Sequence, residues 1–170
     1  MDTYDIYELM MIPPNKKTEM IIDEIRKTKP NLNLVGDLIT LGANLDWQGN
    51  DGIMSALHYC AVLNRPEILG LLISAGADVN IRDNYGRTGL HYCADFYHPE
   101  IARMLIEAGA DLNIQSNGGW TALHESAWHN NLEIAGMLIY AGADVNIQNN
   151  DGKLPYEFIN IQDLEKLLKI

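Results

Sequence analysis

The sequence predicts an all-α solenoid, a row of stacked two-helix units that each end in a projecting loop. Three sequence patterns recur with one spacing. Leu-His at residues 57–58, 90–91 and 123–124 repeats every 33 residues, and Glu-Ile at residues 67, 100 and 133 repeats with the same period. Gly-Ala-Asp follows that period too, beginning at residues 76, 109 and 142. A fixed period of this length is typical of repeat architectures, so the repeat determines the fold class.

The first helix of each unit is expected to begin after a hydroxyl residue. Ser55, Thr88 and Thr121 precede the three copies, and a hydroxyl there can accept hydrogen bonds from the free N–H groups of the first turn. Small residues recur further along the helix, where neighbouring units must pack closely, at Ala61, Ala94 and Ala127.

The second helix of each unit is expected after a residue that favours a left-handed backbone. Asn64 and Asn130 occupy this position in two units, whereas Tyr97 occupies it in the middle unit and departs from the pattern. The second helix of the middle unit, residues 100–108, has an apolar stripe and stops at Gly109. The Asp-, Asn- and Gly-rich stretch that follows is expected to project as a finger.

A unit of two helices and a finger with this period resembles the ankyrin repeat. The Thr-Pro-Leu-His motif of that family is present as Ser-Ala-Leu-His, Thr-Gly-Leu-His and Thr-Ala-Leu-His, starting at residues 55, 88 and 121. The resemblance is strong between residues 33 and 157. It implies an ankyrin-repeat solenoid with β-hairpin-like fingers and about five units, including the capping units.

We expect one domain over residues 1–170, and its fainter first and last units complete the array as caps. The expected divisions are an N-terminal extension, an N-terminal capping repeat, three full repeats and a C-terminal capping repeat, at residues 1–14, 15–46, 47–80, 81–113, 114–146 and 147–170. One inserted residue is expected in the turn at 49–54, where the first full unit is one residue longer.

The two ends are expected to carry helices with a polar outer side, as the terminal units of a stack require. In the predicted helix 15–29, Met20, Ile21 and Ile25 are expected to face inward and the charged residues, Lys17 among them, to face solvent. A second amphipathic helix is expected at 162–169. A short helix over residues 5–11 either packs its apolar side on the first repeat, the favoured alternative, or offers it to a partner; that side consists of Ile6, Leu9 and Met10.

The charge and composition restrict the classes of partner. The chain carries 23 acidic and 12 basic residues and a net charge of −11, which disfavours nucleic acids and anionic membranes because both require clustered Lys and Arg. No apolar run approaches the roughly 20 residues that span a bilayer, and the acidic start does not resemble a signal peptide. We therefore expect a cytoplasmic monomer whose partner is another protein.

Candidate chemistry is sparse, and we expect no enzyme, no cofactor and no metal. Two His-x-Cys pairs, at 58–60 and 91–93, invite a zinc site, but zinc requires four converging ligands and the pairs lie on helices about 8–10 Å apart. The third unit has Glu125 and Ser126 in the two positions after its histidine, which breaks the pattern. Neither a glycine-rich phosphate loop nor a Gly-x-Ser-x-Gly elbow is present.

The resemblance implies roles for two sets of repeated residues. In ankyrin repeats the histidine after the leucine bonds to neighbouring backbone and ties units together, a role that falls here to His58, His91 and His124. Asparagines that form turns in the fingers are hydroxylated in some animal ankyrin repeats, and the matching positions are Asn80, Asn113 and Asn146. Turn formation is a sufficient explanation for these asparagines.

Positions that vary between the units are the candidate binding site. In ankyrin proteins the finger tips and the exposed side of the first helices line a concave groove where partners bind. Trp, Tyr and Arg predominate in binding hot spots, and all three tryptophans of the chain lie at variable positions. The alternative is that each aromatic side chain only packs on its neighbour. The predicted partner-binding residues are Trp47, Tyr85, Arg87, Asp95, Phe96, Asn117, Trp120, Trp128 and His129.

The acidic residues Asp83, Asp95 and Glu125 lie near these positions and would favour a partner with basic or amide groups around an apolar anchor. The sequence thus predicts a binding protein that acts as an inhibitor, an adaptor or a microbial or viral effector. The alternative is a regulatory or accessory subunit in a stable complex with an enzyme. The partner itself is not encoded in any recognisable motif.

Overall fold

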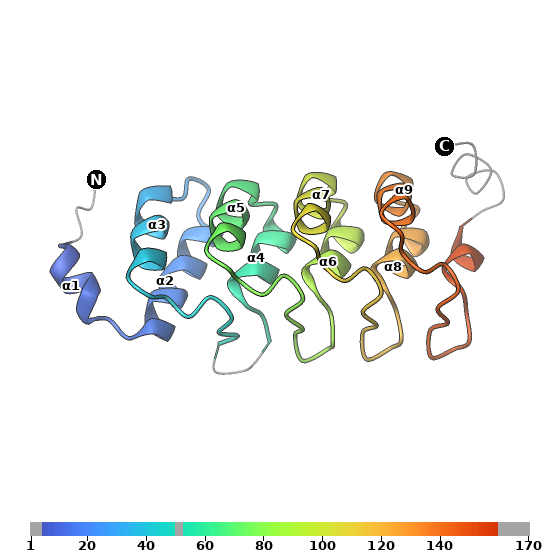
Figure 1. Cartoon of the computed structure of the whole chain (residues 1–170), viewed down its shortest axis with the longest axis horizontal. Helices are drawn as coiled ribbons and strands as arrows, with labels where there is room; N and C mark the ends of the chain where they lie inside the picture. Colours follow the sequence, from blue (N-terminus) through green and yellow to red (C-terminus); the bar gives the residue numbers. More distant parts are fainter. Residues whose placement is uncertain (1–4, 50–52, 160–170) are drawn as a thin grey trace.

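Helix pairs follow one another along the chain in a computed structural model that describes residues 5–49 and 53–159. The pairs stack side by side in one direction (Figure 1). One row of helices is formed by α2, α4, α6 and α8, the other by α3, α5, α7 and α9, and each helix packs on its neighbours in its own row. The bounds are α1 Ile6–Met11, α2 Pro14–Arg26, α3 Leu32–Thr40, α4 Ala56–Leu63, α5 Pro66–Ser74, α6 Gly89–Phe96, α7 Pro99–Glu107, α8 Ala122–Trp128, α9 Leu132–Tyr140 and the 3-10 helix η1 Pro155–Phe158.

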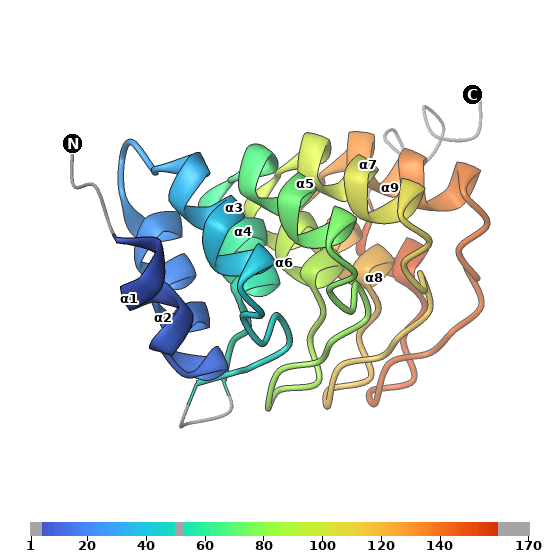
Figure 2. The same cartoon turned by 60° about the vertical axis from the view of Figure 1, so that its left-hand side comes forward.

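The fingers project from the same side of every unit and lie in a row beneath the helices (Figure 2). No β-strand is present in the described parts of the chain. The all-α solenoid predicted from the repeat is confirmed. We call α2, α4, α6 and α8 the inner helices, because they share the hollows described below with the fingers.

The predicted hydroxyl caps are present, with an addition from the repeated histidines. In α4, α6 and α8 the residue before the helix and the histidine three positions later form a capping box. The Thr88 N–H donates to His91 Nδ1 at 3.1 Å, and the corresponding bonds of Ser55 and Thr121 have the same length. A histidine ring therefore takes the part that Glu or Gln plays in the usual capping box.

The predicted left-handed residues separate the two helices of a unit. The φ angles are 51° at Asn64, 58° at Tyr97 and 55° at Asn130. Tyr97 thus adopts the backbone of the asparagines although bulky residues do so rarely. Its exposed hydroxyl donates to Glu133 at 2.8 Å, which links the second and third full units.

Backbone and side-chain hydrogen bonds join each finger to the next. The Asn117 N–H donates to the Tyr85 carbonyl at 2.9 Å and the Asn150 N–H to the Gly118 carbonyl at 3.1 Å. Gly119 has a φ of 78°, and a Cβ at this position would lie 2.5 Å from the Asn150 nitrogen. The fingers therefore approach as closely as they do because glycine occupies their turns.

The turn asparagines also form part of these contacts. Asn80 Oδ1 accepts from the Asp111 N–H at 2.7 Å, and Asn113 Oδ1 accepts from the Asp144 N–H at 2.8 Å. Each finger thus begins with a bond to the finger before it. This agrees with the structural role expected for these asparagines.

One prediction for the first unit, that Lys17 faces solvent, is wrong. Ile21 and Ile25 are fully buried as expected, but Lys17 is only 3% exposed. Its Nζ donates to the Leu41 carbonyl at 2.8 Å, because the end of α3 leaves carbonyl groups without helical partners that a buried ammonium can satisfy. The helix also ends at Arg26, three residues before the predicted end.

The short N-terminal helix α1 only partly matches its predicted packing. Leu9 is buried, whereas Ile6 and Met10 are exposed. Asp5 caps α1 by accepting from the Tyr7 N–H at 3.0 Å. The amphipathic helix predicted at 162–169 lies outside the described residues, as do residues 50–52 of the turn at 49–54 in which the insertion was expected.

Candidate protein-binding surface

Two hollows lie where the inner helices meet the fingers, and together they define what we call the concave face. The first has a volume of about 410 Å³ and lies between α2, α4 and the turn that contains Trp47. The second has a volume of about 330 Å³ and lies between α6, α8 and the finger that contains Trp120. Both are therefore built from helices of neighbouring units and one finger.

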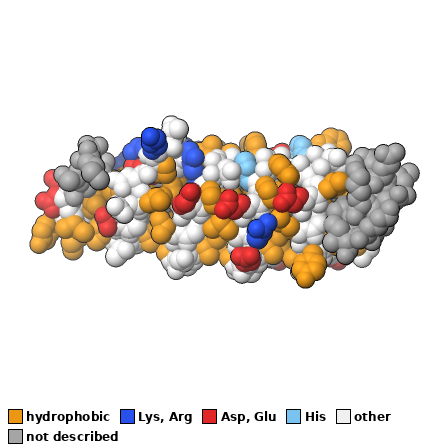
Figure 3. Space-filling model, turned by 90° about the horizontal axis from the view of Figure 1, so that it is seen from above, with side chains coloured by type: hydrophobic (Ala, Val, Ile, Leu, Met, Phe, Trp, Pro, Cys, Tyr) orange, Lys and Arg blue, Asp and Glu red, His pale blue; other side chains and the backbone are white. Residues whose placement is uncertain are grey.

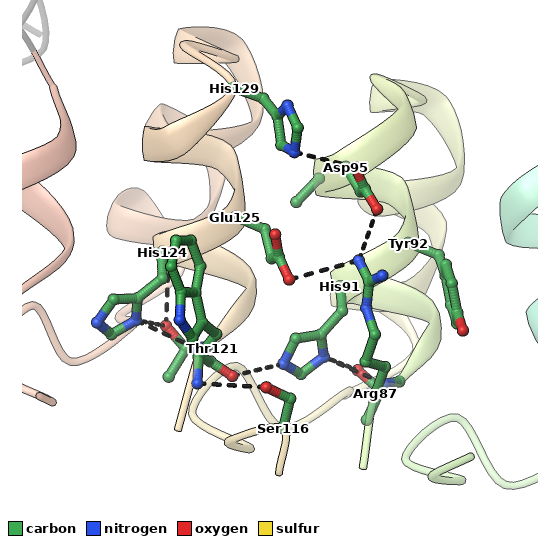
Figure 4. Close-up of polar contacts among 12 residues, drawn as sticks. Arg87, His91, Tyr92, Asp95, Ser116, Thr121, His124, Glu125 and His129 are labelled. Atoms are coloured by element: carbon green, nitrogen blue, oxygen red, sulfur yellow. Dashed lines mark hydrogen bonds and ion pairs between the residues drawn. The ribbon is translucent and has the colours of Figure 1, made fainter. Parts of the chain in front are cut away.

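Arg87 is the centre of a charged network beside the second hollow (Figure 4). Its Nη2 lies 2.8 Å from Asp95 Oδ2 and 3.4 Å from Glu125 Oε1. Asp95 Oδ1 in turn lies 2.9 Å from His129 Nε2. Asp95 belongs to α6, and Glu125 belongs to α8, so one guanidinium from a finger joins two neighbouring inner helices.

An aromatic cluster forms the other wall of this hollow. The Trp120 ring stacks on Phe158 with centroids 5.0 Å apart, and its edge contact with Trp128 has a centroid distance of 5.7 Å. Trp120 is half-buried by these neighbours, whereas Trp128 is 58% exposed. Packing thus accounts for Trp120, whereas Trp128 stays more than half exposed although it also contacts Phe158.

A family model described as ankyrin repeats in three copies matches residues 26–116 and 57–149. The chain belongs to the ankyrin-repeat family. Ankyrin repeats are general protein–protein interaction modules. A search of curated proteins found no match.

The histidines of these ankyrin repeats tie each inner helix to the next finger, as the resemblance implied. The Nε2 atoms of His58, His91 and His124 lie 3.1, 2.8 and 3.1 Å from the carbonyl oxygens of Arg87, Trp120 and Lys153. Because Nδ1 accepts the capping bond, the ring proton belongs on Nε2, which donates to the carbonyl. Two residues of the concave face, Arg87 and Trp120, are therefore held in place by a histidine of the preceding unit.

Burial keeps these three histidines neutral. It lowers the pKa of His91 from its usual value of 6.5 to about 4, although the bond to Trp120 opposes the shift. Burial lowers the pKa of His58 and of His124 in the same direction. A neutral ring is required, since Nδ1 has to accept a hydrogen bond.

Asp83 does not contribute to an acidic surface, contrary to the prediction. It is buried, and its Oδ1 accepts from the N–H groups of Tyr85 and Arg87, each at 2.8 Å. Its Oδ2 accepts from the Tyr92 hydroxyl at 2.5 Å. The carboxylate is used inside the finger, because the tight turn leaves N–H groups without backbone partners.

The ankyrin-repeat finger that carries Asn117 also uses a predicted binding residue for a structural contact. Asn117 Nδ2 donates to the Asn84 carbonyl at 2.9 Å, and Asn150 Nδ2 makes the corresponding bond to the Asn117 carbonyl. The Asn117 amide therefore stacks fingers. Tyr85 and Phe96, by contrast, are exposed by half or more of their surface.

Trp47 lies in the first hollow, away from the other predicted residues. It is partly buried against the hydrophobic core. Arg26 covers the neighbouring Tyr59 ring at 4.8 Å from its centroid, and its Nη2 donates to the Tyr59 hydroxyl at 3.0 Å. The first hollow is thus lined by an arginine that is already paired with an aromatic ring of the chain itself.

Sequence reasoning missed Phe158 and Arg26, and it counted Tyr92 among the variable positions without including it in the predicted binding site. Tyr92 lies under the Arg87 guanidinium at 4.4 Å from the ring centroid. Tyr59 and Tyr92 both follow the repeated histidine, so their equivalence was available from the repeat. No sequence signal indicated Phe158, because its contact depends on how the last described turn packs on α8.

Residues 5–49 and 53–159 offer neither a metal cluster nor a membrane-spanning helix. Within these ranges, no group of three or more His, Cys, Asp and Glu side chains is placed to hold a metal ion. None of the described helices is long and apolar enough to cross a membrane. Cys60 and Cys93 are free and buried, and burial raises the pKa of both thiols, which makes them poor nucleophiles.

Proposed function

We propose that this ankyrin-repeat protein binds a cytosolic partner protein through its concave face and acts by occupying part of that partner's surface. An inhibitor, an adaptor and a microbial or viral effector all work in this way. The observation that carries the proposal is the exposure of two large aromatic residues on adjacent inner helices. Phe96, at the end of α6, is 50% exposed, and Trp128, at the end of α8, is 58% exposed.

Trp128 lines the second hollow together with Asp95 and Glu125, and Phe96 stacks on Tyr92, the ring that lies under Arg87, so apolar and charged groups lie together. Hot spots of protein interfaces combine aromatic anchors with Arg and with charged groups that become desolvated on binding. The face opposite the fingers also shows hydrophobic, acidic and basic side chains along the stack (Figure 3). The concave face is therefore distinguished by the position of Trp128 beside the paired charges, in a hollow between neighbouring units.

The test compares three versions of the full chain as bait in an affinity capture, followed by binding measurements with the purified partner. The concave-face variant combines Phe96→Ser with Trp128→Ser. The control is Tyr140→Ser, because Tyr140 is 92% exposed on the outer helix α9. We expect the concave-face variant to bind the partner at least about 30-fold more weakly, which corresponds to the loss of one hot spot.

Equal binding by the wild type and the concave-face variant would refute the proposal, provided that circular dichroism shows the variant to be folded. A partner that co-purifies at fixed stoichiometry and has catalytic activity would support the accessory-subunit role instead of the free inhibitor or adaptor. Loss of binding only in the Tyr140→Ser control would indicate that the interface lies on the row of helices that includes α9.

A further inference from the structure

The second hollow is lined by both aromatic and acidic side chains. The lining residues are Trp120, Trp128, Asp95, Glu125, His129 and Ser116. Glu125 and Asp95 come from neighbouring helices, and both point toward Arg87 (Figure 4). A side chain that entered this hollow would contact an indole face and a carboxylate together.

The charges of the hollow do not balance. Two carboxylates share one guanidinium, and His129 supplies a full positive charge only when it is protonated. The Glu125 side chain is only 15% exposed, and its distance of 3.4 Å from Arg87 is longer than a charge-assisted hydrogen bond. With a neutral His129 the site carries one surplus negative charge, which is complementary to a cation.

The Arg87 guanidinium cannot itself be the cation that fills the hollow. Arg87 is fixed against the Tyr92 ring on its other side, at 4.4 Å from the centroid. Its position beside both carboxylates also disfavours an acidic ligand, because an anion would have to displace one of them. Trp128 makes edge contacts with Trp120 and Phe158, with centroid distances of 5.7 and 5.5 Å, but it is still 58% exposed and lines the hollow, so a cation can reach its ring.

We propose that this hollow binds an arginine side chain of the partner protein, held between the Trp128 ring and the Asp95 and Glu125 carboxylates. Arginine fits better than lysine, because its planar guanidinium stacks on an aromatic ring while its N–H groups bond a carboxylate. This inference rests on the proposed function, since it names the chemistry by which the concave face recognises its partner. The net charge of −11 would also favour a basic segment as the partner.

The test uses short peptides as probes and the full chain as receptor. The probes are acetyl-Gly-Gly-Arg-Gly-Gly-amide and the same peptide with citrulline, which keeps the shape of arginine and lacks its charge. The indole N–H signals of the tryptophans are followed by NMR during each titration. We expect the signals of Trp120 and Trp128 to shift with the arginine peptide, with a dissociation constant of about 1–10 mM, and the Trp47 signal to stay in place.

Two matched variants separate local recognition from general attraction. Glu125→Gln removes one carboxylate of the hollow, and we expect it to weaken arginine binding about tenfold. Glu107→Gln removes the same charge from the exposed end of α7, outside this hollow, and should leave the affinity within about twofold. The folded state of both variants is checked by their NMR spectra.

Four outcomes overturn the arginine assignment. They are equal shifts with arginine and citrulline, equal weakening by both variants, stronger binding of the corresponding glutamate peptide, and no indole shift at peptide concentrations of tens of millimolar. If the Phe96 and Trp128 variant still loses its captured partner, the proposed function survives and only the arginine assignment fails. If the capture no longer depends on the concave face, the proposed function fails whatever the peptides show.

Discussion

The inner helices α4, α6 and α8 have two sides, and the repeat uses them differently. On the buried side, His58, His91 and His124 make the same two contacts in each unit, one to the capping residue and one to the next finger. On the concave side, the residue after each histidine differs in its contacts: Tyr59 lies under Arg26, Tyr92 lies under Arg87, and Glu125 forms an ion pair.

Within a single turn of an inner helix, one side chain contributes to the stability of the stack and the next contributes to the surface available for recognition. Contacts that recur in every unit hold the stack together, because each unit can bury its apolar face only against its neighbours. Contacts that occur once create a local surface with its own charge and shape. Substitutions on the two sides should therefore have different consequences.

The largest effect is expected from pH. Well above pH 6.5 the buried histidines His58, His91 and His124 are neutral in both the folded and the unfolded chain. As the pH falls toward 4, the unfolded chain binds protons that folded His91 does not. The free energy of unfolding should therefore decrease in this range, by up to about 1.4 kcal/mol per pH unit for each buried histidine. Urea unfolding at a series of pH values measures this slope, and a stability that is independent of pH down to about pH 5 would contradict it.

The variant His91→Gln provides the control for the pH dependence. It removes one titrating ring, so its free energy of unfolding should fall less steeply with acidity than that of the wild type. Carboxylates that titrate at lower pH remain in both chains. If the free energy of unfolding of the variant changed with pH as steeply as that of the wild type, His91 would not contribute to the pH dependence.

The next largest effect is expected from His91→Ala. This change leaves the buried Thr88 N–H and the Trp120 carbonyl without their side-chain partner and removes packing volume in the middle of the stack. We expect a loss of about 3 kcal/mol in the free energy of unfolding. The exposed variant His129→Ala is the matched control and should change it by less than about 0.5 kcal/mol; similar losses in both variants would remove the distinction between the two sides.

The two tryptophans of the second hollow sharpen the comparison on the concave side. Trp120 is packed against Phe158 and Trp128, so Trp120→Ala should lower the free energy of unfolding by about 2 kcal/mol. Trp128 is largely exposed, and Trp128→Ala should lower it by less than about 1 kcal/mol. Thermal and urea unfolding of both variants measure the difference, which would vanish if the aromatic cluster acted as one unit.

The smallest effect is expected from Glu125→Gln. Burial raises the pKa of the Glu125 carboxyl, which means that the folded state disfavours its charge, although Arg87 opposes this shift. Replacement by the neutral amide should change the free energy of unfolding by less than about 0.5 kcal/mol and in the stabilising direction. A loss of more than about 1 kcal/mol would instead assign the Arg87–Glu125 pair to the stability of the stack.

The fold was predictable from the sequence, because its decisive features are local and repeated. Period, capping hydroxyls, left-handed asparagines and the histidine position all lie within one unit, and three copies reinforce one another. The candidate site was predictable only in part. Phe96 and Trp128 are exposed on the inner helices, as expected for positions on the exposed side of the first helices. The surface role predicted for Asp83 was wrong, because its carboxylate is buried. Asn117 is exposed and also bonds the neighbouring finger, so its predicted binding role stays a prediction.

The sequence by itself determined which residues belong to the repeated interior and which positions vary. It could not determine which variable side chains remain available, since that depends on partners from other units. Lys17 is buried because the end of α3 supplies a carbonyl, and Trp120 is half-buried because Phe158 lies against it. Arg87 is shared by two carboxylates only because stacking brings α6 and α8 side by side. These outcomes depend on distances between units, and such distances exist only in the tertiary structure.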